Sequence, residues 1–272
     1  MDVRELEGPI AVIGGGVMGE TMVSGLVRAG VASHRMRVAD ASATRCEELQ
    51  QRYGVATAET NADACFEARI VLLVVKPHIV APVLAEIATV LEPGALVVSL
   101  AAGISLASLE SALKPGTPVV RVMPNTPARI GAGMAAISPG RHAGSHQIAV
   151  VKAMMDAVGA SVVIEERLQD AATACSGSGP AYVFLVAEAM VDAGVQLGLT
   201  RDVATQLVNA TLRGSAELLA TSGTHPAVLR NQVTSPGGTT AAALAVLETH
   251  GIRAAFSAAM GACAARSAEL GA

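Results

Sequence analysis

A glycine-rich stretch near the start of the chain has the residue types and the spacing of a phosphate-binding loop. Residues 14–19 read GGGVMG, which fits the pattern G-x-G-x-x-G between a strand-like run and a helix-like run. The first glycine of such a loop makes a tight turn, the second lets a pyrophosphate approach the backbone, and the third allows close helix–strand packing. The helix N-terminus adds positive potential. We therefore expect a dinucleotide pyrophosphate to bind at Gly14, Gly16, Val17, Met18 and Gly19.

A second polar stretch stands late in the chain, where residues 233–244 read VTSPGGTTAAAL. A proline, two glycines and two threonines precede an alanine-rich, helix-like run. A helix N-terminus presents unpaired backbone N–H groups and the positive end of the helix dipole. Because the first loop already serves a dinucleotide, this stretch predicts a site for a second ligand. The alternative is an ordinary capped helix turn.

The residues expected near the adenosine ribose favour two different cofactors. Asp40 lies about twenty residues after the glycine loop, where a carboxylate accepts hydrogen bonds from a ribose 2′-hydroxyl and favours NAD. Ser42, Thr44 and Arg45 follow closely and could instead hold a 2′-phosphate. Electrostatics alone favours NAD slightly, and both readings stay open at this point.

Three further loops occur where strand-like runs end. They are Lys76-Pro77, Ala101-Ala102-Gly103, and residues 123–127, which read MPNTP and include Asn125. Ligands of open α/β sheets bind beyond the carboxyl ends of the strands. We therefore expect these loops to surround the nicotinamide end of the cofactor.

The elements that must position these loops differ between the two halves of the chain. Up to residue 164, short β-branched runs (PIAVIG, RMRVAD, RIVLLVV, ALVVSL, PVVRVM and ASVVIE) alternate with helix-like stretches at residues 21–28, 43–51 and 82–91. This alternation predicts a doubly wound, parallel α/β sheet. After residue 165 the strand signal stops, and helices are expected at residues 182–197, 201–219 with Thr200 as N-cap, 226 onward, 239–248 and 253–270.

The predicted organisation is therefore a Rossmann-type domain over residues 1–165 and an all-helical domain over residues 166–272. The helical half has few bulky side chains, so it has little apolar volume from which to build a hydrophobic core of its own. Burial of its faces against a second copy of the chain predicts a homodimer or a larger homo-oligomer.

Composition excludes several other classes of protein. The net charge of −4 argues against a general nucleic-acid binder. The run IVLLVV at residues 70–75 is too short to span a bilayer, and the charged start does not resemble a signal peptide. The four cysteines form no C-x-x-C pair, and neither a metal-ligand spacing nor a Ser–His–Asp arrangement is present. We expect a cytoplasmic protein that binds no nucleic acid, membrane or metal.

Five motifs in this order (GGGVMG, VKP, MPNTP, SGSGPAY and SPGGTT) resemble the pyrroline-5-carboxylate reductases over nearly the whole chain. SPGGTT behind the segment HPAVLRNQV is the most specific part. The resemblance implies a Rossmann domain followed by a helical dimerisation domain. It also implies hydride transfer from NAD(P)H to the C=N bond of 1-pyrroline-5-carboxylate, which gives L-proline, with NADPH as the expected cofactor and NADH as the alternative.

The resemblance also implies roles for single residues. Asn61, Lys76, Pro77 and Ala102 would lie near the cofactor beyond its pyrophosphate. The substrate would meet Glu166, Ser235, Gly237, Gly238, Thr239 and Thr240. Of these, Ser235 and nearby N–H groups would hold the carboxylate, and the Thr240 hydroxyl would bond the imine nitrogen.

The sequence departs from the family pattern at two positions, and two other functions remain as alternatives. Gln232 replaces an asparagine of some relatives, and Gly223 replaces a glutamate that would offer Lys76 a charge partner. A β-hydroxyacid dehydrogenase would need a lysine in the helical half as its general acid, and residues 169–272 contain no lysine. A non-catalytic dinucleotide sensor would keep the glycine loop but would not need SPGGTT.

Overall fold

The computed structural model describes residues 1–271, which form two compact units. The first unit comprises Met1–Ser178 together with the end of the chain from Cys263, and the second comprises Gly179–Ala262. The last helix thus begins in the second unit and ends in the first.

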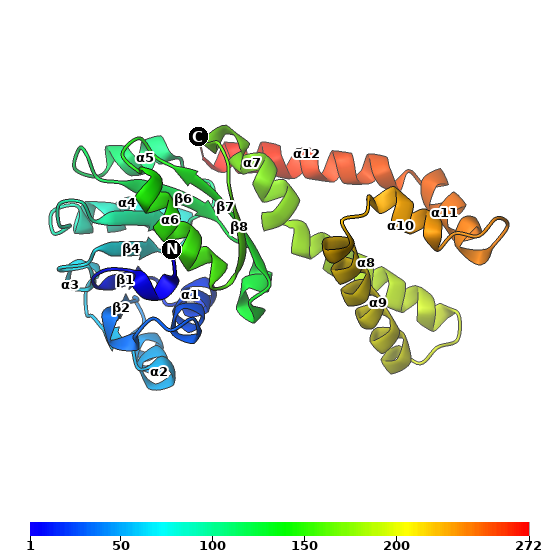
Figure 1. The fold of residues 1–272 in the computed structure, drawn as a ribbon, viewed down its shortest axis with the longest axis horizontal. Coiled ribbons are helices and arrows are strands. Elements are labelled where there is room, and N and C mark those ends of the chain that lie inside the picture. The colour runs from blue at the N-terminus through cyan, green and yellow to red at the C-terminus, as the bar shows by residue number, and fades with distance from the viewer. Residues whose placement is uncertain (272) are drawn as a thin grey trace. The chain divides into compact units, whose positions relative to one another are not determined.

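The first unit is built on one eight-stranded sheet with the order β3-β2-β1-β4-β5-β6-β7-β8 (Figure 1). All neighbouring strands are parallel except β6 and β7, which are antiparallel. The strands are β1 (Ile10–Ile13), β2 (Met36–Ala39), β3 (Ala56–Thr57), β4 (Ile70–Leu73), β5 (Leu96–Ser99), β6 (Val119–Met123), β7 (Gly133–Pro139) and β8 (Gly159–Val163). The expected doubly wound α/β fold is confirmed.

Helices cover both faces of this sheet, so the central strands are buried on both sides. Along β1, Ile10 and Val12 belong to one apolar cluster and Ala11 and Ile13 to the other. This alternation explains why buried parallel strands read as continuous apolar runs. The α-helices that lie wholly in this unit are α1 (Val17–Arg28), α2 (Ala43–Tyr53), α3 (Asn61–Cys65), α4 (Pro77–Ile87), α5 (Leu106–Ser111), α6 (Ser145–Asp156) and α7 (Gln169–Ala172).

The structure corrects the expected helix over residues 82–91. Helix α4 begins at Pro77, contains Pro82 and ends at Ile87. Pro82 donates no backbone hydrogen bond, which normally disfavours a helix interior. Its ring is exposed, however, and burial of Val80, Leu84 and Ile87 favours a helix that continues through it.

Strand β7 was not expected from the sequence. It reads GMAAISP, and its glycine, alanines and proline have low strand propensity. It forms because it pairs with β6 on one side and β8 on the other. Its neighbours, rather than its own residues, make it a strand.

The second unit is all helical, as expected. It contains α8 (Gly179–Gln196), α9 (Arg201–Ser222), α10 (Pro226–Gln232), α11 (Thr239–Thr249) and the first part of α12 (Ile252–Leu270). The predicted N-cap is confirmed, because the Thr200 side chain accepts a hydrogen bond from the Val203 N–H.

The buried core of the second unit is small, and its apolar surface is large. Only Val191, Ala204 and Val208 form a buried apolar cluster among its described residues. Phe184 and Leu185 of α8 are 64% and 65% exposed. Exposed apolar surface of this extent indicates that another surface covers these helices.

One stretch satisfies the length and composition of a membrane span. Residues Glu166–Gln196 are successive helical turns with a hydropathy of 1.2, and only 11% of the most apolar window is buried. An apolar helix that is covered in an assembly meets the same criteria of length and composition.

Candidate functional site

The glycine loop joins β1 to α1, and each of its three pattern glycines stands in a different environment. Gly14 has a φ of +102°, and a Cβ there would lie 2.6 Å from the Val74 carbonyl oxygen. A Cβ at Gly19 would collide with the Gly14 carbonyl oxygen. At Gly16, by contrast, a Cβ would meet no atom within 4 Å. The chain itself therefore requires Gly14 and Gly19, whereas the space at Gly16 is open to a ligand.

The N-terminus of α1 is suited to a phosphate group. Gly16 is its N-cap and supplies no side-chain hydrogen bond, and Gly16 and Val17 are exposed. The first-turn N–H groups of a helix have no acceptor within the helix. They carry the positive end of its dipole. The open space at Gly16 and these N–H groups fit a dinucleotide pyrophosphate.

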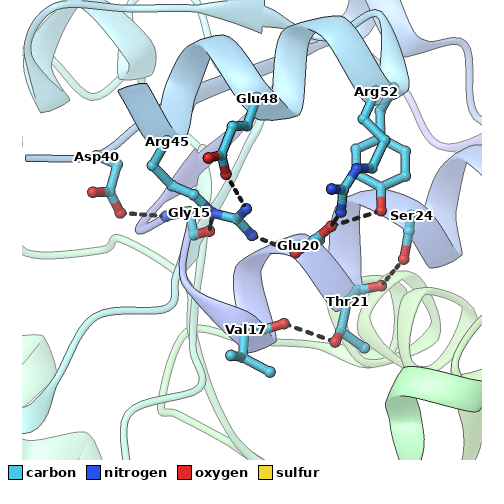
Figure 2. Close-up of polar contacts among 10 residues, drawn as sticks. Gly15, Val17, Glu20, Thr21, Ser24, Asp40, Arg45, Glu48 and Arg52 are labelled. Atoms are coloured by element: carbon cyan, nitrogen blue, oxygen red, sulfur yellow. Dashed lines mark hydrogen bonds and ion pairs between the residues drawn. The ribbon is translucent and has the colours of Figure 1, made fainter. Parts of the chain in front are cut away.

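Asp40, just after β2, and Arg45, in the first turn of α2, hold the peptide groups on both sides of Gly15 (Figure 2). The Asp40 carboxylate accepts the Gly15 N–H through Oδ2 at 2.7 Å and the Ser42 N–H through Oδ1 at 2.9 Å. The Arg45 Nε donates to the Gly15 carbonyl oxygen at 2.6 Å. Asp40 therefore lies beside the glycine loop, as a residue that reads the adenosine ribose must.

Arg45 also belongs to a charge cluster that links α1 to α2, which comprises Glu20, Arg45, Glu48, Arg52 and Tyr53. The Arg45 guanidinium pairs with Glu20 and with Glu48, the latter at 2.8 Å, and Arg52 also pairs with Glu20. Burial opposes ionisation of Glu20, but hydrogen bonds from Arg45, Tyr53 and Arg52 outweigh it and lower the pKa of this carboxyl. Hydrogen bonds to the carboxylates of Glu20 and Glu48 raise the pKa of Arg45.

Sequence reasoning did not anticipate Glu20 or its cluster. A signal was nevertheless present, because Arg45, Glu48 and Arg52 stand three and four residues apart and therefore share one face of α2. Glu20 itself is partly buried in the folded protein, and a carboxylate that loses water on burial is stabilised by a cationic partner.

The loops after β4 and β5 lie at the same sheet edge as the glycine loop. Ile13, at the end of β1, pairs with Leu73, and Leu73 pairs with Ser99. Lys76 is the exposed N-cap of α4, Pro77 is its first residue, and Ala102 is exposed after β5. Their placement agrees with the expected nicotinamide end of a dinucleotide site.

Asn61 and Asn125 form hydrogen bonds within the protein. Asn61 Nδ2 donates to Glu86 Oε2 at 2.6 Å. Asn125 Nδ2 donates to the carbonyl and hydroxyl oxygens of Ser176, both at 3.2 Å, and its Oδ1 accepts the Met134 N–H. These bonds give both side chains a structural role, and their contact with a cofactor stays a prediction.

Glu166 lies in the first unit, just after β8. Its Oε1 accepts the Leu106 N–H at 2.6 Å and a guanidinium N–H of Arg121 at 3.2 Å. The Arg121 side chain is only 8% exposed. An arginine inside the apolar run VVRVM was a sequence signal for such a pair, because a buried charge needs a partner.

The stretch Ser235–Thr240 lies in the second unit, where the turn after α10 leads into the first two residues of α11. The Gly238 N–H donates to the Ser235 carbonyl oxygen at 3.0 Å, and Gly237 has a φ of +67°. This is a tight turn with proline and glycine at its centre. Gly238 is the N-cap of α11 and provides no side-chain hydrogen bond.

The hydroxyl groups of this turn are available to a ligand. Within residues 1–271, the side chains of Ser235, Thr239 and Thr240 form no hydrogen bond. Ser235 and Thr239 are exposed, and Thr240 is half-buried. Together with the uncapped N–H groups of α11, the turn presents several donors for a small anion.

The sheet order, the glycine loop and the second, helical unit define an oxidoreductase-type Rossmann protein. Family models agree: residues 9–103 match the family described as NADP oxidoreductase, coenzyme F420-dependent. Residues 166–270 match the pyrroline-5-carboxylate reductase dimerisation family.

Similarity to individual proteins extends over the whole chain. A pyrroline-5-carboxylate reductase from Corynebacterium melassecola is 47% identical over 96% of this chain and 98% of its own. The structure of a pyrroline-5-carboxylate reductase from Coxiella burnetii matches with a TM-score of 0.93 and 36% identity, covering 97% and 99% of the two chains. The Plasmodium falciparum pyrroline carboxylate reductase with NADP bound matches with a TM-score of 0.88 and 29% identity, covering 98% and 99%. This chain belongs to the pyrroline-5-carboxylate reductase family.

Proposed function

We propose that this protein reduces the C=N bond of 1-pyrroline-5-carboxylate with hydride from NAD(P)H and so forms L-proline. Family membership over 96% of the chain is the observation that carries this proposal. The two uncapped helix entrances, at α1 and α11, support it because the reaction needs one anionic site for a dinucleotide and one for a substrate carboxylate.

The residues of the chain mainly bind and orient, because a bound nicotinamide supplies the hydride. The N–H groups at the start of α1 hold the pyrophosphate, and Lys76, Pro77 and Ala102 border the nicotinamide end. The turn at Ser235–Gly238 holds the substrate carboxylate. The Thr240 hydroxyl bonds the ring nitrogen and orients the imine for reduction.

We propose NADPH as the preferred cofactor, with appreciable use of NADH. The description of the family matched by residues 9–103 and the NADP-bound relative support NADPH. NADH is supported by Asp40, whose carboxylate lies beside Gly15 and can accept a ribose hydroxyl. The same carboxylate repels a 2′-phosphate, so the preference is expected to be modest.

Residues 166–272 are proposed as the dimerisation and substrate-binding domain, in a homodimer or a larger homo-oligomer. The dimerisation family matched by residues 166–270 and the exposed apolar side chains of α8 support this assembly. A cytoplasmic location is proposed with it, because the four cysteines are free thiols, as is usual in a reducing compartment.

Cofactor oxidation with and without the imine tests the function. The purified protein should oxidise NADPH only when 1-pyrroline-5-carboxylate is present, with one proline formed for each cofactor oxidised. If the protein binds NADPH but does not oxidise it with the imine, the sensor alternative is correct. Activity on a β-hydroxyacid, and none on the imine, would establish the dehydrogenase alternative.

A further inference from the structure

Two side chains of opposite charge hold the backbone of the glycine loop at Gly15. Asp40 accepts the N–H of Gly15 at 2.7 Å, and Arg45 donates to the carbonyl oxygen of the same residue at 2.6 Å (Figure 2). Leu49 of α2 also packs there, because a Cβ at Gly15 would lie 2.9 Å from its Cδ1. Asp40 and helix α2 thus cover Gly15, whereas Gly16 faces open space.

Arg45 has no nitrogen left without a partner. Its Nε bonds the loop carbonyl, one terminal nitrogen pairs with Glu48 at 2.8 Å, and the other pairs with Glu20. A 2′-phosphate would have to compete with two carboxylates for this guanidinium, whose side chain is only 22% exposed. Arg45 is therefore poorly placed to distinguish NADPH from NADH.

The charge on Glu20 gives Arg45 a second effect on the loop. Glu20 stands in the first turn of α1, next to Gly19, where the pyrophosphate is expected. An unpaired carboxylate at that place would repel the ligand. Arg45 and Arg52 both pair with Glu20, but only Arg45 also bonds the loop.

We propose that Arg45 is a positioning residue for the cofactor, which holds the Gly15 peptide and Glu20 so that the α1 N-terminus accepts the pyrophosphate of NADH and NADPH equally. The proposal rests on the proposed binding of a dinucleotide at this loop. The proposal assigns Arg45 to binding of the pyrophosphate. From its position in the sequence, Arg45 could instead have held the 2′-phosphate of the ribose.

Equilibrium binding of both cofactors tests this assignment, with Arg45→Met as the variant and Arg52→Met as the matched control. Arg52 shares Glu20 with Arg45 but does not touch the loop. Arg45→Met should weaken NADPH and NADH by the same factor, about tenfold, as expected for one lost charge-assisted hydrogen bond. Arg52→Met should change neither affinity by more than about twofold.

Fragments of the cofactor locate the effect within the ligand. In displacement of bound NADPH, followed by its fluorescence, ADP-ribose should lose affinity in Arg45→Met because it contains the pyrophosphate. Adenosine 2′-monophosphate lacks the pyrophosphate and should bind as it does to the wild type. A loss of affinity confined to NADPH and to adenosine 2′-monophosphate would overturn the proposal, because Arg45 would then contact the 2′-phosphate.

Amide hydrogen exchange in the cofactor-free protein provides a readout that does not depend on binding. Exchange over residues 14–19 should be faster in Arg45→Met than in the wild type and unchanged in Arg52→Met. Unchanged exchange and affinity in Arg45→Met would overturn the proposal. If Arg45→Met does not fold, Arg45→Lys keeps the charge and one donor and should show a smaller, equal loss for both cofactors. A wild type that binds neither cofactor would instead refute the proposed function.

Discussion

At the scale of the residue, Thr240 lies at the second position of α11 with its hydroxyl free of hydrogen bonds among residues 1–271. Thr240→Val keeps the shape and removes that hydroxyl. The lost bond should lower both kcat and kcat/KM, because it strengthens as the imine nitrogen changes charge and geometry. We expect a loss of about 1.5–4 kcal/mol, or roughly tenfold to a thousandfold in kcat/KM.

Steady-state kinetics beside direct cofactor titration measures this effect, and nucleotide affinity should change little. Thr249→Val is the matched control, since Thr249 stands at the far end of α11 and its hydroxyl bonds the Ala245 carbonyl oxygen. Wild-type kcat/KM in Thr240→Val would mean that the Thr240 hydroxyl has no role beyond the start of the helix.

Asp40 is expected to affect both the preference between NADPH and NADH and the affinity for each cofactor. Asp40→Ser should raise the preference for NADPH, because it removes repulsion of the 2′-phosphate. It should also weaken both cofactors, since the Gly15 N–H loses its 2.7 Å acceptor. Asp40→Asn removes the charge but keeps an acceptor, so it should shift the preference with a smaller loss of affinity. Paired titrations test this, and a fall in NADPH preference in either variant would refute the role of Asp40.

At the scale of the element, Glu20 joins α1 to α2 through Arg45 and Arg52. The folded protein lowers the pKa of Glu20 below its usual value of 4.5. A lowered pKa means that the stabilisation is fully present above pH 4.5 and is lost as the pH falls through the folded-state pKa. Glu20→Gln should therefore lower the free energy of unfolding at neutral pH, by about 1 kcal/mol after allowance for partial exposure.

Denaturant titrations between neutral and acidic pH measure this difference. The gap between wild type and Glu20→Gln should stay constant down to about pH 4.5 and close below it. Glu248→Gln breaks the exposed pair with Arg253 and should have a much smaller effect at physiological salt. A gap that persists at the lowest pH would show that the ion pairs do not cause it.

At the scale of the whole molecule, the exposed apolar side chains of the second unit predict an obligate homodimer. Leu185→Asp places a charge on α8 at a side chain that is 65% exposed in one chain. It should shift the protein to monomers and abolish activity. Ile130→Asp is the control, because Ile130 is 80% exposed in the first unit. Light scattering over a dilution series measures assembly, and an active, stable monomer of the wild type would contradict the prediction.

Local pattern determined much of this protein from the sequence alone. Six strands, the glycine loop, the Thr200 cap and the switch from strands to helices were all predicted. Each depends on residues within a short window, where side-chain periodicity and turn chemistry act. The order of motifs likewise predicted the family.

Other features were decided only by the tertiary structure. Strand β7 exists because β6 and β8 flank it, and α4 continues through Pro82 because its apolar face is buried. The sequence left open whether Arg45 holds a ribose 2′-phosphate, and only the fold places Glu20, 25 positions away, against its guanidinium. The free energy of such contacts depends on distance in space and on burial, and the spacing of residues along the chain carries neither.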